Sequence, residues 1–312
     1  MKCLVVGGAG YIGRELCRQL AARGDDLYVL ARSSPPKDAP GVWLQADIRR
    51  LESIQAGLGG QKFDIIFHTA SHANDYGDPV DMVATNLQGL VNMLTYARDT
   101  KTGRFVLTSS VSAHGWYPGA RFHPADYLPV DEEHPTRPED MYSSTKRMQE
   151  ILGLTFYHQY GLPVTALRLT VVAGPAGHGG SKAWRTFAEK LHEGKSVQIF
   201  HFSAEEICHY VDVRDVARMH LVAGEHPNAP GEIFNCCGPT PTRGSEFAAM
   251  VERLVPGIKV EYGFPWSLAQ GGEIYFTMAK AKALLGYEPE YSFEQTLGCI
   301  KQWVDEGGLV KD

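Results

Sequence analysis

The sequence predicts an α/β fold in which a doubly wound parallel sheet carries a smaller, discontinuous C-terminal lobe. Apolar strand-like segments alternate with amphipathic helical segments through the first half, and a glycine turn follows the first strand. This rhythm is typical of a parallel sheet with helices on both faces. The expected strands are residues 2–6, 27–31, 63–70, 104–110 and 163–170, and the expected long helices are residues 80–98 and 139–160.

The first of these strands leads into the turn Gly7-Gly8-Ala9-Gly10 and then into a helix that contains Gly13. Glycines at 8, 10 and 13 have the GxGxxG spacing, which allows a tight turn, close approach of backbone amides to a pyrophosphate, and close packing of helix on strand. Ile12, Leu16 and Leu20 recur at helical spacing behind the turn. The sequence therefore predicts a dinucleotide site at the helix N-terminus.

Residue 175 marks a change in the pattern, because the strand-and-helix rhythm loosens after Gly174-Pro175. We expect residues 1–175 and 208–237 to form a Rossmann domain that binds NAD(P). Residues 176–207 and 238–312 would form the smaller substrate-binding lobe. Since ligands of open α/β sheets bind beyond the carboxyl ends of the strands, a lobe placed there would close over the cofactor.

Composition narrows the class of partner. The 312 residues are 44% hydrophobic and 21% charged, and the net charge of −6 is spread without a long block of either sign, so nothing indicates a nucleic-acid or membrane partner. Met1-Lys2 leads directly into a strand, and no apolar run approaches the length of a membrane span, so we expect a cytoplasmic protein with a small-molecule substrate. The six cysteines lack zinc-site spacing, so we expect free thiols and no metal.

Two residues of the second long helix predict catalysis. Tyr142 and Lys146 are four residues apart, so the phenol and the ammonium lie on one face, one turn apart. A nearby positive charge favours the phenolate, and a free tyrosine is a poor base at neutral pH without that help. The strand 104–110 ends in Ser110, whose hydroxyl would lie at the same edge of the sheet.

Several ordered motifs resemble the extended short-chain dehydrogenase/reductases, also called the NAD-dependent epimerase/dehydratase family. The resemblance covers nearly the whole chain. It is carried by the glycine turn, Asp47-Ile48, Phe67-His68-Thr69-Ala70, Asn86, Ser110, Tyr142 with Lys146, Arg168, Gly174-Pro175, the segment 210–216 and the segment 281–289.

The resemblance implies a role for each matching residue. Tyr142 would be the general acid/base, Lys146 would hold the nicotinamide ribose and depress the tyrosine pKa, and Ser110 would orient the reacting carbonyl or hydroxyl. Asn86 would support the backbone, and a homodimer is expected of the family. The cofactor-binding residues would be Gly7, Gly10, Tyr11, Ile12, Gly13, Arg32, Ser33, Asp47, Ile48, Ala70 and Lys146.

The end of the second strand bears on the choice of cofactor. NAD sites usually carry Asp or Glu there, whereas this chain has Arg32 and Ser33, a cation and a donor suited to a 2′-phosphate. NADP is therefore favoured over NAD. In the alternative, Arg32 only stacks on adenine and NAD binds as well.

The segment 114–123 between the catalytic serine and tyrosine should lie over the nicotinamide. A hydroxyl-rich or carboxylate-bearing molecule could stack on Trp116 and pair with Arg121, although such aromatic residues also pack against lids with no ligand. Four residues that follow strands into the same crevice are further substrate candidates, namely Ser71, His72, Ser112 and Thr170.

We therefore expect an NAD(P)-dependent oxidoreductase that transfers hydride between nicotinamide and a secondary alcohol or ketone of a small, sugar-like substrate. Two features argue against a diphosphate-bearing substrate. Residues 171 and 172 are valines, where many nucleotide-sugar enzymes have an asparagine that binds phosphate, and the acidic pair Glu205-Glu206 would repel a diphosphate. The alternative is a nucleotide-sugar epimerase that retains NAD. A nucleotide-sensing regulator is a third class, and the intact Ser110, Tyr142 and Lys146 argue against it.

Overall fold

The computed structural model describes residues 1–36, 39–72, 77–116, 123–176, 181–263 and 273–309. Within these ranges seven strands form one parallel sheet, in the order β11-β6-β5-β4-β1-β2-β3. The sheet strands are β1 (Lys2–Val6), β2 (Asp26–Ala31), β3 (Val42–Gln45), β4 (Ile65–His68), β5 (Arg104–Ser110), β6 (Val164–Leu169) and β11 (Ile233–Cys236).

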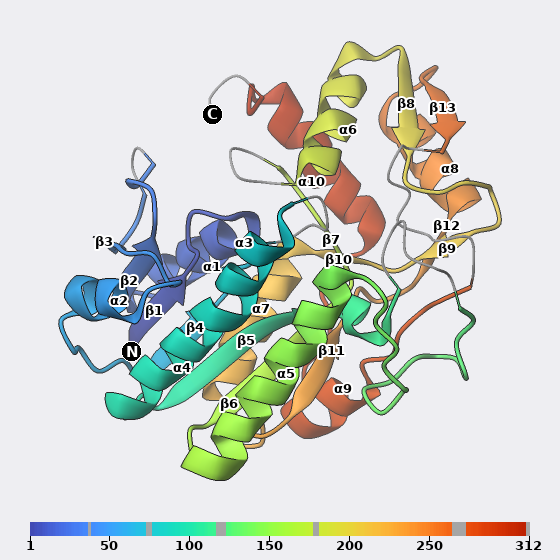
Figure 1. Cartoon of the computed structure of the whole chain (residues 1–312). Coiled ribbons are helices and arrows are strands. Elements are labelled where there is room, and N and C mark those ends of the chain that lie inside the picture. The colour runs from blue at the N-terminus through green and yellow to red at the C-terminus, as the bar shows by residue number, and fades with distance from the viewer. Residues whose placement is uncertain (37–38, 73–76, 117–122, 177–180, 264–272, 310–312) are drawn as a thin grey trace.

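Helices cover both faces of this sheet (Figure 1). One apolar core lies between the sheet and the helices α1 (Tyr11–Ala22) and α7 (Val213–Glu225), and the other lies on the opposite face. The elements on that second face are α2 (Leu51–Leu58), α3 (Pro79–Val83), the π-helical turn η1 (Ala84–Gln88), α4 (Gly89–Asp99) and α5 (Met141–Tyr160). The predicted doubly wound α/β fold is confirmed.

The strand order reverses between β1 and β4, because the chain first builds β2 and β3 on one side and then β4, β5 and β6 on the other. Such a switch point leaves a crevice beyond the carboxyl ends of the two central strands. The 3₁₀ helix η2 (Val111–His114) follows β5 at this same edge. The fold thus brings the ends of β1, β4 and β5 to one rim.

A second group of elements lies at this end of the sheet (Figure 1). Its apolar core is built around Trp184, Phe187, Phe200 and Phe247. The elements are α6 (Lys182–Glu193), α8 (Gly244–Leu254), α10 (Phe293–Asp305) and the short strands β7 (Val171–Ala173), β8 (Ser196–Ile199), β9 (Ile207–Cys208), β10 (Tyr210–Asp212), β12 (Thr242–Arg243) and β13 (Lys259–Tyr262).

One helix differs from the expected division. The helix α9 (Ala279–Leu285) packs through Ala281 and Leu285 into the same core as α1 and α7. Residues near 280 therefore belong with the large sheet, whereas the sequence placed the whole of 238–312 in the smaller lobe. The apolar spacing of a short helix fixes which face is buried and does not show which core receives it. The other domain boundaries stay a prediction.

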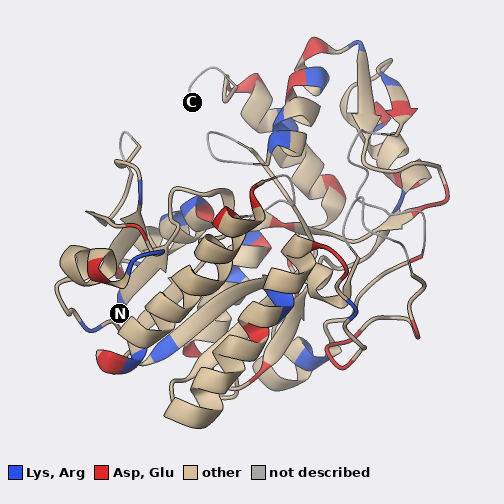
Figure 2. Cartoon of the chain, viewed as in Figure 1, with Lys and Arg blue, Asp and Glu red and all other residues tan. Residues whose placement is uncertain are grey.

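Charged side chains of both signs are interspersed along the elements (Figure 2). Among the described residues, no helix combines the length and the apolar character that crossing a membrane requires. The same residues contain no group of three or more His, Cys, Asp or Glu side chains arranged to hold a metal ion.

Five histidines in the described part of the chain have pKa values lowered by burial. The pKa is about 3 for His68 and His114 and about 4 for His201, His209 and His220. The ordinary pKa of histidine is 6.5, so below this pH these histidines become protonated in the unfolded chain. In the folded chain they stay neutral until the pH approaches 3 to 4. Their stabilising contribution is therefore full above about pH 6.5 and is lost on acidification.

We accordingly expect the free energy of unfolding to fall steeply between pH 7 and pH 5, by up to about 1.4 kcal/mol per pH unit for each buried histidine. Urea denaturation at several pH values measures this slope. Replacing the exposed His192 with glutamine should leave the slope unchanged. A free energy of unfolding that stays constant across this range would contradict the assignment of these groups as neutral and buried.

Candidate active site

The glycine turn after β1 brings bare backbone to the crevice. A Cβ on Gly7 would lie 2.7 Å from the backbone nitrogen of Ala70, so the loops after β1 and β4 touch. A Cβ on Gly13 would lie 2.3 Å from the carbonyl oxygen of Gly7. Gly10 is the N-cap of α1, which has neither a side-chain cap nor an acidic residue in its first turn. The helix N-terminus therefore offers backbone amides to an anion, and these residues fit a dinucleotide pyrophosphate.

Tyr11 and Ile12 turn their side chains away from this turn. The Tyr11 ring packs against the core of the smaller lobe, its hydroxyl is buried without a hydrogen-bond partner among the described residues, and burial raises its pKa. Ile12 packs against the core between α1, α7 and the sheet. The roles of Tyr11 and Ile12 in cofactor binding stay predictions.

The variant Gly13→Ala should weaken binding of NAD or NADP at least about tenfold, or about 1.4 kcal/mol, because the new methyl group would force α1 away from the turn. Titration calorimetry measures the affinity, and circular dichroism reports whether the fold survives. Gly298→Ala is the matched control, because a Cβ there meets nothing within 4 Å. Equal cofactor affinity of the two variants would contradict the role of the turn.

Two guanidinium groups follow β2 and β3, where the adenosine end of the cofactor is predicted to bind. Arg32 and Ser33 directly follow β2 and are both exposed. Asp47 accepts hydrogen bonds from Arg49 Nε and Nη2 at 2.9 and 2.6 Å, and these bonds lower the pKa of the Asp47 carboxyl. Ile48 is buried. Arg49 was not predicted, although its place two residues after Asp47 is a visible signal.

The buried Asn86, in the π-helical turn η1, holds the loop after β4. Its side-chain oxygen accepts hydrogen bonds from Ser71 Oγ at 3.1 Å and from the His72 amide at 2.7 Å. Its amide nitrogen donates to Thr145 Oγ1 on α5 at 3.0 Å. Asn86 therefore ties two predicted substrate residues, Ser71 and His72, to the helix that carries the predicted catalytic pair, as its expected supporting role requires.

The predicted catalytic pair lies at the start of α5. Lys146 is 2% exposed, and its Nζ lies 5.7 Å from the centre of the Tyr142 ring. The ammonium donates a hydrogen bond to the carbonyl oxygen of Thr108 on β5 at 3.0 Å. Burial lowers the pKa of Lys146 to about 8, and the charge of Glu150 one turn further along opposes this shift. The arrangement places a buried ammonium beside a phenol, which favours phenolate.

Ser110 ends β5 and is the N-cap of η2. Its Oγ accepts from the backbone amide of Ser112 and donates to the Ser112 hydroxyl, both at 3.1 Å. Because α5 packs against η2, the structure brings the segments that carry Ser110, Tyr142 and Lys146 together. A hydroxyl, a phenol and an ammonium gathered at the carboxyl edge of a parallel sheet can exchange a proton with an alcohol or carbonyl bound there.

Similarity to known proteins extends over most of the chain. Residues 3–237 match the NAD dependent epimerase/dehydratase family. The chain belongs to this family. A UDP-glucuronate 4-epimerase of Thermodesulfobacterium geofontis is 28% identical over 97% of this chain and 96% of the relative.

Solved structures of epimerases share the fold of this family member. An epimerase from Methanothermobacter thermautotrophicus is 25% identical, with a TM-score of 0.83 over 98% of this chain and 93% of that one. The UDP-glucose 4-epimerase of Thermus thermophilus in complex with NAD is 24% identical, with a TM-score of 0.79 over 98% of both chains. These comparisons favour the epimerase alternative over net redox, and they do not support the preference for NADP.

Two predicted substrate residues of this epimerase/dehydratase family member, Trp116 and Thr170, are buried against other parts of the protein. Trp116 is 5% exposed and packs against His134 and Phe276, and its Nε1 donates to the carbonyl oxygen of His123 at 2.8 Å. The structure thus favours the packing interpretation for Trp116 over stacking on a ligand. Thr170 is 7% exposed and donates to the carbonyl oxygen of Cys236 on β11 at 3.3 Å.

Two more predicted substrate residues complete this comparison. Ser112 is 7% exposed and lies beside Ser110, at the rim where the catalytic segments meet. Arg121 lies outside the described residues. The substrate roles of both residues stay predictions.

Sequence reasoning missed Glu150. This carboxylate is fully buried and accepts from Arg168 Nε and Nη2 at 2.8 and 2.9 Å, from Ser109 Oγ at 2.7 Å and from Arg147 Nη1 at 3.0 Å. The signal was its spacing, because positions 142, 146 and 150 follow one face of a helix. A buried acidic residue at that spacing needs a cationic partner, and the resemblance to the family already included Arg168.

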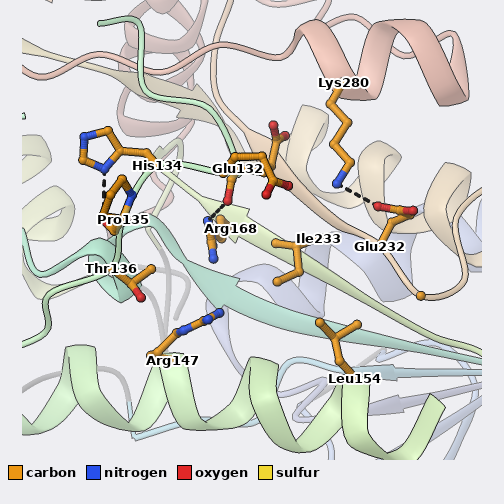
Figure 3. A pocket seen from close by; sticks show the side chains of 12 residues that line it. Glu132, His134, Pro135, Thr136, Arg147, Leu154, Arg168, Glu232, Ile233 and Lys280 are labelled. Carbon is orange, nitrogen blue, oxygen red and sulfur yellow. Dashed lines mark hydrogen bonds and ion pairs between the residues drawn. The ribbon is translucent and has the colours of Figure 1, made fainter. Parts of the chain in front are cut away.

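A cavity of about 350 Å³ lies beside α5, which contributes Arg147 and Leu154 to its lining (Figure 3). Glu232 and Lys280 form an ion pair at 2.7 Å at its edge. Arg147 and Arg168 both reach it, whereas no predicted catalytic or cofactor residue lines it. The remaining lining residues are Glu132, Glu133, His134, Pro135, Thr136, Leu154, Gly231 and Ile233.

Proposed function

We propose that the protein is a nucleotide-sugar epimerase that retains NAD and inverts one secondary alcohol carbon by oxidation and re-reduction. Membership of the epimerase/dehydratase family supports this reaction class, and the relatives named as 4-epimerases support it over net redox. The observation that carries the proposal is the buried Lys146 ammonium, 5.7 Å from the Tyr142 ring at the edge where β5 ends.

When bound, the nicotinamide supplies hydride acceptance and return. Tyr142 takes the proton of the substrate hydroxyl as hydride leaves the carbon, and gives it back when the alcohol forms again. Lys146 stabilises the phenolate, and its Nζ, which donates to the Thr108 carbonyl, would also hold a ribose hydroxyl of the bound cofactor. With substrate bound, the Ser110 hydroxyl would turn from Ser112 and donate to the substrate oxygen, which stabilises developing negative charge.

The nucleotide that co-purifies with the protein tests this proposal. The account predicts one tightly held NAD per chain, which remains through gel filtration and is released on denaturation. With UDP-glucose or UDP-glucuronate, the enzyme should form the 4-epimer without net production of NADH. An empty site that takes up and turns over NADPH with a carbonyl substrate would overturn the epimerase assignment.

A second candidate is the NADP-dependent oxidoreductase of the same fold. The exposed Arg32 and Ser33 favour it, because an arginine and a hydroxyl donor after β2 suit a 2′-phosphate. The two candidates differ in the cofactor retained and in whether it is consumed. The substrate remains a small molecule in both, and cytoplasmic location and a homodimer stay predictions.

A further inference from the structure

The last three residues of β5 are held by different partners. The Thr108 carbonyl accepts from Lys146 Nζ at 3.0 Å, and the Thr108 hydroxyl hydrogen-bonds with His220 Nε2 of α7 at 2.8 Å. The Ser109 hydroxyl donates to Glu150 Oε1 at 2.7 Å. The proposed catalytic Ser110 follows directly. Lys146 and Glu150 are one helical turn apart on α5, so consecutive turns of α5 bond consecutive residues of β5.

The Glu150 carboxylate is fully buried and is saturated by its donors. Arg168 of β6 binds it through two nitrogens at 2.8 and 2.9 Å, and Arg147 binds Oε2 at 3.0 Å. Two guanidinium groups and one hydroxyl leave the carboxylate no free position from which to accept a substrate proton. Glu150 is therefore not placed to act as a base.

Arg168 extends the same network to η2. Its Nη1 donates to His114 Nε2 at 3.2 Å and to the Glu132 carbonyl oxygen at 2.9 Å. His114 is the last residue of η2, which Ser110 caps, and Glu132 lies in the segment that leads into α5. One buried carboxylate and one buried guanidinium thus connect β5, β6, η2 and α5.

We propose that Glu150, together with Ser109 and Arg168, is a positioning unit that sets the register of the Tyr142–Lys146 turn against Ser110. This inference rests on the proposed function, since it assigns that pair to the chemistry. Apolar packing between α5 and β5 would tolerate small shifts and rotations, whereas directional, charge-assisted hydrogen bonds fix one alignment. A buried ion pair is a weak source of net stability, so alignment is the better account of its presence.

The cleanest variant is Ser109→Ala, which removes one hydrogen bond and keeps the Glu150–Arg168 ion pair. Thr165→Val is the matched control, because it also removes a buried hydroxyl whose 2.8 Å bond to the Ala229 carbonyl lies away from the site. Both variants remove one buried side-chain hydrogen bond, so a difference between them in the Tyr142 titration reports positioning rather than the loss of a bond as such. We expect Ser109→Ala to lower kcat about tenfold with KM nearly unchanged.

Ionisation of the Tyr142 phenol supplies a readout that needs no substrate. Tyrosinate absorbance is titrated in each variant, and the same titration of Tyr142→Phe is subtracted. Among the described residues, the charged and titratable groups around the turn include Asp140 at the N-cap of α5, Lys146, Arg147 and Glu150 on α5, His68 on β4, His114 on η2, Arg168 on β6 and His220 on α7.

We expect Ser109→Ala to shift the midpoint of phenol ionisation upward by about one pH unit, because the Lys146 ammonium would move away from the Tyr142 ring. Thr165→Val should titrate like the unmodified protein. A midpoint that does not move in Ser109→Ala would overturn the proposal. A shifted midpoint in a protein that fails to epimerise any sugar nucleotide would keep the positioning unit and reject the proposed function.

Discussion

Replacing Tyr142 with phenylalanine should lower turnover by about 10³-fold, because the reaction loses its proton-transfer group. The ring and its packing remain, and Lys146 keeps its hydrogen bond to the Thr108 carbonyl. Cofactor affinity should therefore change by less than about twofold, or about 0.4 kcal/mol. Steady-state rates and NAD titrations on the same preparation separate the two effects.

The matched control for this variant is Tyr160→Phe, which removes a phenol from the last turn of the same helix, where the side chain is 46% exposed. That change should leave turnover at the level of the unmodified protein. Full activity in Tyr142→Phe would reject the phenol as the acid/base, whatever the state of the cofactor.

The variant Glu150→Gln should lower the free energy of unfolding by about 3 to 5 kcal/mol, because it leaves Arg168 buried without its carboxylate. The Arg168 side chain is 2% exposed, so its charge would stay buried after the change. Urea denaturation near neutral pH measures the loss.

An exposed ion pair provides the control for this second variant. Arg185 and Glu189 pair at 3.3 Å on α6, with the Glu189 side chain 48% exposed. Glu189→Gln should cost less than about 0.5 kcal/mol, as exposed pairs usually do. If both variants unfolded at the same urea concentration, the Glu150 carboxylate would not be the buried partner that the structure shows.

Much of the fold was predictable because local pattern and tertiary structure agree. The predicted strands 2–6 and 104–110 coincide with β1 and β5. The strand Val42–Gln45 was missed, since it is a short edge strand with half-buried and exposed residues after a proline-rich segment. The predicted helix 80–98 is interrupted by the π-helical turn Ala84–Gln88, which apolar spacing could not reveal.

The site was predictable where spacing alone brings groups together, as for Tyr142 and Lys146 on one helical face. Trp116 shows the limit, because an aromatic residue in a loop has the same sequence signal whether it packs or binds. The preference for net redox had a similar weakness. It relied on Arg32, whose position after the second strand suits a 2′-phosphate, and on Val171, Val172 and the pair Glu205-Glu206, interpreted as unfavourable for a diphosphate. Neither signal fixes the reaction.

The central claim is that Tyr142 serves a nicotinamide that is reduced and reoxidised within one turnover. The most direct measurement mixes the purified protein, without added cofactor, with a UDP-sugar, and follows nicotinamide absorbance and the stereochemistry of the sugar together. The account predicts that the 4-epimer accumulates over many turnovers with no lasting rise in reduced nicotinamide. Product that forms only in proportion to added NADP or NADPH would contradict it.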